Sequence, residues 1–266
     1  MIVLKNEAKE GIQICNTDLY KGNQIKAILF DMDGVILDTE KLYLRFWREA
    51  AASYGYEMTE EMALSMRSLN HVAGDKLMKE YFGPYVDYQM IRNKRMKMMD
   101  MFIVKHGVDI KPGIYELLDF LKENNVKSAV ATSSPYDRAR YYLGSVGILT
   151  AFEGVASVQR VKCGKPEPDI YLYAIEKMGL QPEECLVLED SPNGILAAYR
   201  AGCVPVMVPD QDGPDDEMRE QIYAVADSLL KVIDLLEVLP DPEPEEEELE
   251  GEESDGEEVE SKEETE

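Results

Sequence analysis

The chain has 266 residues, of which 45% are hydrophobic, so it can bury a core large enough to fold unaided as one large domain or two modest ones. The formal net charge is −25, but residues 240–266 hold 16 acidic side chains and one lysine, which leaves −10 for residues 1–239. A mildly acidic body excludes nucleic acid as a main partner, because binding to its phosphates requires a basic face.

The cysteine, histidine and apolar patterns exclude three further classes of protein. The four cysteines include no C-x-x-C pair and there are only two histidines, which argues against a zinc site and a disulfide framework. No apolar run approaches the roughly 18 residues of a membrane span, and the first ten residues lack the apolar core of a signal peptide. We therefore expect a protein of the reducing cytoplasm with no membrane partner.

Short apolar runs alternate with helical stretches from residue 25 onward. Residues 1–24 are mixed in character and are expected to form a leader or an edge element. Five runs suit buried parallel strands: 25–30, 127–132, 185–189, 204–208 and, more weakly, 154–157. The stretches with helical patterning between them are 114–123, 136–145, 169–178 and 193–201. This alternation predicts an α/β fold with a doubly wound parallel sheet.

One interval, residues 38–111, interrupts the alternation. Its 74 residues have helical patterning and no convincing strand, whereas a simple crossover needs only about a dozen. We expect an inserted all-helical domain, with helices near residues 40–54, 60–66, 73–81 and 85–106. Nine of the fourteen methionines lie here, and we interpret them as gap-filling core in preference to an adaptable pocket wall.

The last segment, residues 240–266, is dominated by glutamate. Such a composition cannot bury enough apolar area to offset the entropy lost on ordering, so the sequence predicts a disordered acidic tail. A like-charge run is usually just solvated, and no partner of this tail can be named.

The strongest chemical signal is D-M-D-G-V-I-L-D-T-E at residues 31–40, directly after the first strand. Carboxylates at the C-terminal end of a strand stand where open α/β sheets bind ligands. Asp31 and Asp33 need a turn to converge on one site, and Gly34 makes that turn plausible. A solvated turn is the simpler alternative. A calcium loop is excluded, because its glycine comes sixth and a helix precedes it.

Three further motifs follow in order. Thr132 ends the second strand in A-V-A-T-S-S, Lys165 lies in K-C-G-K-P-E-P-D, and Glu189 with Asp190 closes a later strand in L-V-L-E-D-S-P-N-G. Together with residues 31–40 they resemble the four motifs of the haloacid dehalogenase superfamily. The chain is most similar to the group of β-phosphoglucomutase and phosphoglycolate phosphatase.

The resemblance implies a domain organisation. A Rossmann-like core is expected over residues 25–37 and 112–239, with a helical cap over 38–111. The leader (1–24) and the acidic tail (240–266) lie outside it.

The resemblance also implies catalytic roles. Asp31 is the candidate nucleophile, because a covalent aspartyl-phosphate divides the hydrolysis of a stable phosphate ester into two easier steps. Asp33 would protonate the leaving oxygen and later activate water. Lys165, Thr132 and Ser133 would hold the phosphoryl oxygens. The next residue, Ser134, would either contact phosphate or cap the following helix.

Mg²⁺ is the expected cofactor, since a cation must offset the repulsion between the carboxylate and the phosphate. By resemblance its ligands are Asp31, the backbone carbonyl of Asp33, and Asp190, with Glu189 close by. Taken alone, Asp190 could instead cap the helix that follows.

The sequence thus favours a Mg²⁺-dependent phosphatase acting on a small phosphorylated metabolite, a sugar or organic-acid phosphate. A phosphomutase of the β-phosphoglucomutase type is the main alternative. A haloacid dehalogenase is less favoured, because displacing a halide needs no acid such as Asp33. A non-catalytic binding protein would lack Asp31 or Lys165, and both are present.

Cap residues separate the phosphatase from the mutase. β-Phosphoglucomutases carry a histidine ten residues beyond the general acid, where this chain has Tyr43. They also carry a cap arginine for the distal phosphate. The comparable stretch of this chain is R-S-L-N-H at residues 67–71, in which His71 stands nearest the position of the mutase arginine. Arg67 lies a few residues before that position and is the alternative candidate for binding the distal phosphate. Both departures favour hydrolysis.

Overall fold

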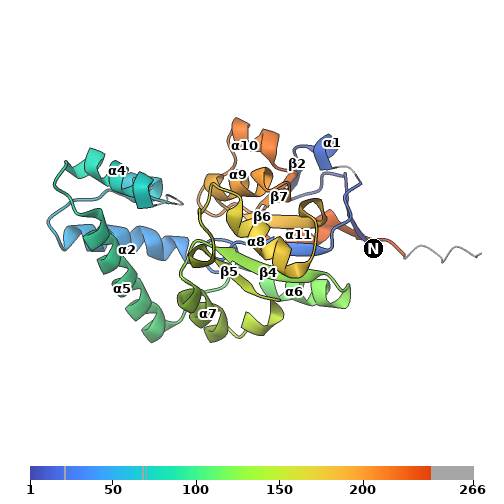
Figure 1. The fold of residues 1–266 in the computed structure, drawn as a ribbon, viewed down its shortest axis with the longest axis horizontal. Coiled ribbons are helices and arrows are strands. Elements are labelled where there is room, and N and C mark those ends of the chain that lie inside the picture. The colour runs from blue at the N-terminus through green and yellow to red at the C-terminus, as the bar shows by residue number, and fades with distance from the viewer. Residues whose placement is uncertain (21, 68, 70, 241–266) are drawn as a thin grey trace, which may run out of the picture.

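A seven-stranded sheet lies at the centre of the protein (Figure 1). The structure is a computed structural model that describes residues 1–20, 22–67, 69 and 71–240, so the expected tail beyond residue 240 lies outside the described residues. The strand order is β2-β8-β7-β6-β3-β4-β5. The strands are β2 (Ile12–Ile14), β3 (Ala27–Phe30), β4 (Lys127–Thr132), β5 (Val155–Ser157), β6 (Cys185–Glu189), β7 (Val204–Met207) and β8 (Ala224–Ala226).

The five expected apolar runs all form strands of this sheet, and neighbouring strands among them are parallel. This confirms the α/β fold. The sheet is not wholly parallel, because β2 pairs antiparallel with β8 at one edge. Residues 1–24 therefore contribute an edge strand, and β1 (Ile2–Leu4) forms a second, small sheet with β9 (Leu236–Val238). Strands of three residues are too short to show a clear alternation in the sequence.

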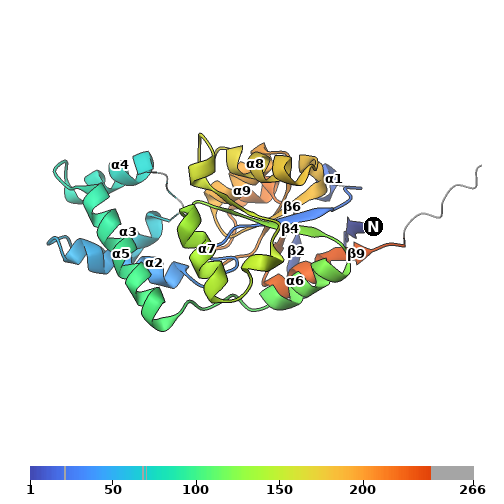
Figure 2. The same ribbon diagram turned by 60° about the horizontal axis from the view of Figure 1, so that its bottom comes forward.

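Helices cover both faces of the sheet (Figure 2). Successive strand residues point to opposite faces, so Ile28 and Phe30 join one apolar cluster while Leu29 joins the other. The first cluster includes residues of α6 (Ile114–Glu123), α7 (Tyr136–Ser145) and α11 (Leu229–Leu235), and the second includes residues of α8 (Asp169–Met178) and α9 (Pro192–Arg200). Among the described residues, no helix combines the length and apolarity needed to cross a bilayer. The smaller helices are α1 (Thr17–Tyr20), η1 (Leu149–Ala151), η2 (Val158–Arg160), η3 (Pro182–Glu184) and α10 (Asp216–Gln221).

Four helices between β3 and α6 lie beside the sheet, at the left of Figure 1. They have an apolar core of their own around Trp47 and Ile91, in which Met58, Met66 and Met78 are buried. Methionine thus fills this core, as the gap-filling interpretation predicts. The helices are α2 (Glu40–Ala52), α3 (Glu60–Ser65), α4 (His71–Phe82) and α5 (Tyr88–His106).

The chain leaves the sheet for these helices and returns through two adjoining segments. Leu37 bridges to Ile110, and the N–H of Asp38 donates to the carbonyl of Asp109 at 2.9 Å. The N–H of Lys111 donates to the carbonyl of Ile36 at 2.8 Å. This double connection holds α2 over the C-terminal ends of the strands.

Candidate active site

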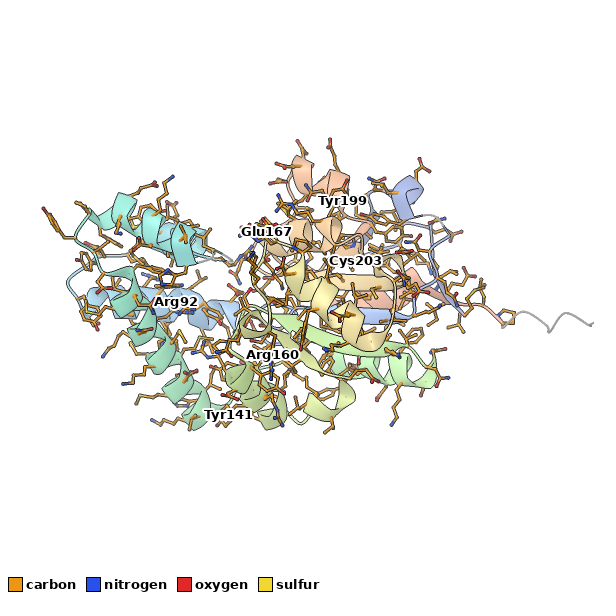
Figure 3. The ribbon with its side chains drawn as sticks, in the orientation of Figure 1. Arg92, Tyr141, Arg160, Glu167, Tyr199 and Cys203 are labelled. Atoms are coloured by element: carbon orange, nitrogen blue, oxygen red, sulfur yellow. The ribbon has the colours of Figure 1, made fainter. Side chains whose placement is uncertain are left out.

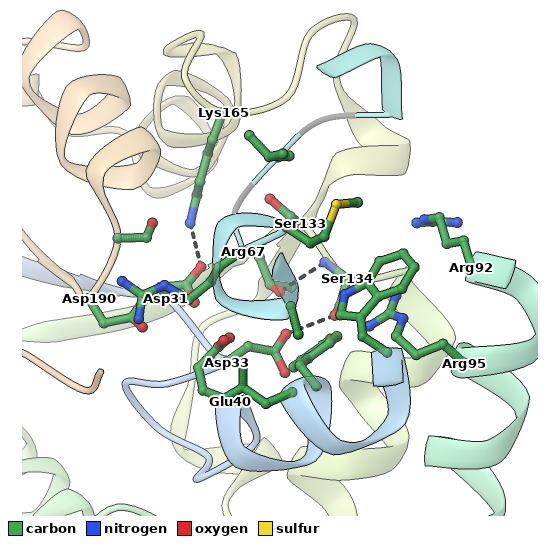
Figure 4. A pocket seen from close by; sticks show the side chains of 18 of the residues that line it. Asp31, Asp33, Glu40, Arg67, Arg92, Arg95, Ser133, Ser134, Lys165 and Asp190 are labelled. Atoms are coloured by element: carbon green, nitrogen blue, oxygen red, sulfur yellow. Dashed lines mark hydrogen bonds and ion pairs between the residues drawn. The ribbon is translucent and has the colours of Figure 1, made fainter. Parts of the chain in front are cut away.

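A cavity of about 160 Å³ lies between the C-terminal ends of the strands and the helices α2, α3 and α5 (Figure 4). Asp31, Thr132 and Asp190 line it from the sheet, and Tyr43 and Arg95 line it from the helices. Open α/β sheets bind their ligands at this edge. The topology therefore brings the expected motifs to one place.

A tight turn after β3 presents the first two carboxylates. The N–H of Asp31 donates to the carbonyl of Leu188 at 3.0 Å, which continues the pairing of β3 with β6 by one step. The turn then passes through Gly34 at φ +90°, a conformation that favours glycine. A Cβ at Gly34 would lie 2.4 Å from Oδ2 of Asp190, so the glycine also lets the turn approach this carboxylate.

Two hydroxyl groups hold Asp33 from different segments. Thr39 Oγ1 donates to Oδ1 of Asp33, and Ser134 Oγ donates to Oδ2, each at 2.8 Å. Ser134 is therefore not the cap of α7, whose first flanking residue is Pro135. With one donor on each oxygen, the Asp33 carboxylate has a defined orientation at the cavity.

Lys165 joins the ends of three neighbouring strands. Its Nζ donates to Oδ1 of Asp31, to Oε1 of Glu189 and, at 3.0 Å, to the carbonyl of Ala131. The side chain is buried, which opposes the charged ammonium, but the carboxylates of Asp31 and Glu189 raise the pKa of Lys165 above its ordinary value. Lys165 is thus a fixed positive charge beside Asp31.

Glu189 and Asp190 are adjacent in sequence but differ in their contacts. Glu189 is fully buried and accepts from Tyr171 Oη at 2.6 Å and from Ser191 Oγ at 3.0 Å, in addition to Lys165. Asp190 is also buried, yet its Oδ2 has no hydrogen-bond partner within residues 1–20, 22–67, 69 and 71–240. Asp190 does not cap α9, because Ser191 takes that place and its Oγ accepts from the N–H of Gly194 at 3.1 Å.

The carboxylates Asp31, Glu189 and Asp190 fit a divalent cation. One ligand atom from each lies within 4.8 Å of the others. Burial, opposed by Lys165 and reinforced by Glu189 and Asp33, raises the pKa of Asp31 to about 8. Burial and the nearby carboxylates raise the pKa of Asp190 well above its ordinary value. Three buried carboxylates beside one ammonium leave negative charge to be offset, and the unpartnered Oδ2 of Asp190 is a ready ligand atom for a hard cation.

The expected phosphate-binding residues lie at the cavity wall. Thr132 ends β4, is buried, and accepts from the N–H of Ser134 at 3.0 Å through its Oγ1. Ser133 is exposed and lines the cavity. Both line the same cavity as Asp31 and Lys165.

Of the three cap residues singled out in the sequence, the structure brings two to the cavity. Tyr43 and Arg67 line it, whereas His71 does not. His71 is the exposed first residue of α4, where its Nε2 bonds to Oε1 of Gln89. The assignment of His71 to the substrate site is therefore corrected, because an exposed side chain at the first residue of α4 lies outside the cavity lining. Arg67 Nη2 pairs with Oδ2 of Asp212 at 3.1 Å, and its Nη1 is buried with no partner in the described part of the chain.

Sequence reasoning did not single out Glu40, Arg92, Arg95 and Arg138, which also line the cavity. Glu40 is buried, and burial together with Asp33 raises its pKa to about 8. It ends the motif at residues 31–40, so its position was a usable signal. Arg92 and Arg95 are three residues apart on α5 and share a face, but surface helices carry many such pairs.

Comparison with known proteins identifies the family. A family model of haloacid dehalogenase-like hydrolases matches residues 25–202. The chain belongs to this family. Within the family, a phosphorylated carbohydrates phosphatase of Thermotoga maritima is 33% identical over 178 residues, which cover 67% of this chain and 82% of that protein. The β-phosphoglucomutase of Bacillus subtilis is 29% identical over 190 residues, covering 69% of this chain and 83% of the mutase.

A solved structure in this family has the same architecture. The crystal structure of a putative β-phosphoglucomutase from Thermotoga maritima matches with a TM-score of 0.64 and 29% identity, covering 79% of this chain and 99% of that one. The resemblance drawn from the four motifs is thereby confirmed. The family's named phosphatases hydrolyse phosphate monoesters, and this chain is an enzyme of that hydrolase class.

Proposed function

We propose that this member of the haloacid dehalogenase-like family is a Mg²⁺-dependent phosphatase of small phosphorylated metabolites that acts through an aspartyl-phosphate. The observation that carries the proposal is the meeting of Asp31, Asp33 and Lys165 at one cavity, each held in place by its own hydrogen bonds. Preorganised groups of this kind act on the transition state without further rearrangement.

In the first step an Asp31 oxygen attacks phosphorus, and the bond from phosphorus to the substrate oxygen breaks. Asp33 gives a proton to that leaving oxygen, so the product departs as an alcohol. Thr39 and Ser134 keep the Asp33 carboxyl group directed at the reacting centre. Lys165 balances the negative charge of Asp31 and of the transferring phosphoryl group.

In the second step water attacks the phosphorus of the aspartyl-phosphate. Asp33, deprotonated by the first step, accepts a proton from that water, and the bond to Asp31 breaks. Inorganic phosphate leaves, and Asp31 and Asp33 return to their starting states. One carboxyl group thus serves both steps as acid and then as base.

Asp31, Asp190 and the backbone carbonyl of Asp33 would hold Mg²⁺, with Glu189 supporting the site. When bound, the ion supplies positive charge that offsets the repulsion between the carboxylate and the phosphate ester. The oxygen-only donor set and the unpartnered Oδ2 of Asp190 support this choice of a hard cation.

The size of the cavity supports a small substrate. Its volume of about 160 Å³ suits a sugar phosphate or an organic-acid phosphate rather than a phosphoprotein segment. The name of the Thermotoga maritima relative, a phosphorylated carbohydrates phosphatase, supports a sugar phosphate.

Hydrolysis is preferred to the mutase reaction because of Tyr43. This side chain lies where β-phosphoglucomutases carry a histidine. Burial, followed by the charge of Asp33, raises the pKa of Tyr43 to about 12, so it is a neutral phenol near pH 7. It cannot supply the positive charge of a protonated histidine. The identity with the Bacillus subtilis β-phosphoglucomutase keeps a phosphomutase as the second candidate.

The test is a screen of the purified protein with Mg²⁺ against sugar phosphates and organic-acid phosphates, measuring phosphate release. We expect release from at least one ester and none after chelation of the metal. A second assay supplies β-glucose 1-phosphate with a trace of the 1,6-bisphosphate. Glucose 6-phosphate accumulating much faster than free phosphate would establish the mutase and overturn the phosphatase.

A further inference from the structure

Charge is unevenly distributed along the cavity (Figure 4). The carboxylates Asp31, Asp33 and Asp190 lie at the end of the sheet. Two arginines of α5, Arg92 and Arg95, line the cavity from the opposite side, and Figure 3 shows Arg92 on this helix. We call these two arginines the distal subsite. Because the phosphoryl group must sit beside Asp31, the distal subsite faces the other end of a bound substrate.

Arg95 is buried with part of its hydrogen-bonding capacity unused. Only 5% of the residue is exposed, and its Nε and Nη1 have no hydrogen-bond partner among the residues that the structure describes. The guanidinium carbon lies 4.6 Å from the ring centre of Tyr43 and 4.7 Å from that of Trp47. These rings attract the face of the cation, but the N–H groups on Nε and Nη1 point along its plane and remain to be satisfied.

The charges around Arg95 do not supply a counter-ion. Burial, together with the neighbouring cations of Arg138 and Arg92, lowers the pKa of Arg95, while Tyr43 acts in the opposite direction. Arg138 is itself paired with Asp100 at 2.9 Å. In the described part of the chain, neither Arg92 nor Arg95 forms an ion pair with a carboxylate.

Another cavity arginine behaves differently. Arg67 has the carboxylate of Asp212 at 3.1 Å to balance its charge. Keeping a buried guanidinium without a counter-ion is costly, and a folded protein tolerates it where a ligand completes the site. Among the described residues, the distal subsite is therefore a part of the cavity whose buried positive charge has no carboxylate counter-ion.

We infer that the preferred substrate carries a second anionic group, a carboxylate or a second phosphate, at the end remote from the phosphoryl group, and that the distal subsite binds it. The inference rests on the proposed function. A planar guanidinium presents two parallel N–H groups that match the oxygens of either anion, and such charge-assisted pairs are strong. A neutral polyol in the same place would leave the cation uncompensated.

Matched pairs of esters test the inference with the full chain and Mg²⁺. The pairs are 3-phosphoglycerate with glycerol 3-phosphate, 6-phosphogluconate with glucitol 6-phosphate, and fructose 1,6-bisphosphate with fructose 6-phosphate. Within each of the first two pairs the esters differ by a carboxylate, on a three-carbon and a six-carbon chain. Within the third pair they differ by a second phosphate. In at least one pair we expect kcat/KM to favour the doubly anionic ester by about 10- to 100-fold, the value of a charged hydrogen-bonded pair.

Variants locate the preference. Arg95→Met keeps an apolar stem against Tyr43 and Trp47 and should reduce the ratio of kcat/KM within the pair by about 10-fold or more. Arg92→Gln, at a half-buried position, should reduce it less. Lys94→Met, on the exposed face of the same helix, is the matched control and should leave the ratio unchanged. Because the readout is a ratio within one variant, partial unfolding does not affect it.

Binding separates this inference from the proposed function. Calorimetry on Asp31→Asn measures the Kd of each ester without turnover. Tighter binding of the doubly anionic ester, lost in the double variant with Arg95→Met, supports the subsite even if no ester is hydrolysed. Equal kcat/KM and equal Kd within all three pairs, or a preference that survives both arginine substitutions, would overturn it. Failure of hydrolysis alone would overturn only the phosphatase.

Discussion

At the sheet end of the cavity the buried Lys165 and Glu189 have hydrogen-bond partners, whereas at the α5 end two N–H groups of the buried Arg95 guanidinium find none among the described residues. Lys165 donates to three acceptors, and Glu189 accepts from Lys165, Tyr171 and Ser191. Arg95 has two aromatic rings over its faces and two nitrogen atoms without hydrogen bonds. Lys165 and Glu189 thus have their partners before substrate arrives, whereas Arg95 keeps N–H groups for a ligand.

The difference follows from what each end must do. Groups that act on a transition state lower the barrier most when they need not move, so the sheet end is rigidly hydrogen-bonded. A group that recognises a ligand gives specificity when it forms hydrogen bonds with the correct ligand and stays unpaired with others. Asp190 is the exception at the sheet end, and its unpartnered Oδ2 faces the place proposed for the metal ion.

Removing the nucleophile should give the largest effect. Asp31→Asn keeps the shape of the side chain but cannot form the acyl-phosphate, so phosphate release should fall by about 10⁴-fold or more. The control is Asp38→Asn, in the same segment, where a surface ion pair with Lys41 at 2.6 Å contributes little. Release measured with Mg²⁺ decides the matter. If Asp31→Asn kept most of its activity, the covalent mechanism would be wrong.

Removing the buried ammonium should break the network at the sheet end. Lys165→Met leaves the carboxylates of Asp31 and Glu189 without their shared cation, so the free energy of unfolding should fall by about 3–5 kcal/mol. Turnover should fall by about 10²- to 10³-fold, as when one charge-stabilising donor is lost. Urea unfolding and phosphate release test the two effects. Exposed Lys162 in the same loop gives the control Lys162→Met, and equal stability of both variants would contradict the network.

Glu40 allows a test by pH. Its pKa of about 8 in the folded protein exceeds its ordinary 4.5, so the folded chain keeps a proton that the unfolded chain loses between these values. Stability from this group is present below pH 4.5 and is lost as the pH rises through 8. The wild type should therefore lose about 4 kcal/mol relative to Glu40→Gln from pH 5 to pH 9.

Urea unfolding across this pH range, without metal, measures the difference. The control is Glu49→Gln, at an exposed position of the same helix, α2, whose curve should run parallel to the wild type. If the free energies of unfolding of the wild type and of Glu40→Gln changed in parallel with pH, the pKa of Glu40 would not be raised by burial.

Truncation after Leu239 should have the smallest effect. In the described part of the chain the cavity is lined by residues between Asp31 and Ser191, so neither end of it uses residues near the truncation point. We expect kcat/KM to change by less than about twofold, because contacts that do not differ in the transition state leave the rate unaltered. A large loss would reveal a docking or regulatory role for the acidic segment.

Much of the core could be predicted from the sequence because its signals are local. The stretches 114–123, 136–145 and 169–178 coincide with α6, α7 and α8, since apolar spacing and flanking proline and glycine define a helix within a few residues. The edge strand β2 and its partner β8 have three residues each, and their pairing joins segments some two hundred residues apart. No local pattern contains that information.

The sequence by itself determined the reacting end of the cavity. Asp31 and Asp190 directly follow β3 and β6, and parallel neighbouring strands bring such positions together whatever the rest of the chain does. Lys165 reaches them from the loop between β5 and α8. The far end was decided only by tertiary structure. Arg95 meets Tyr43 and Trp47 because α5 packs across α2, and His71 is turned away at the start of α4. Helix packing depends on surfaces assembled from distant residues, so the recognition end of this site becomes visible only in the folded protein.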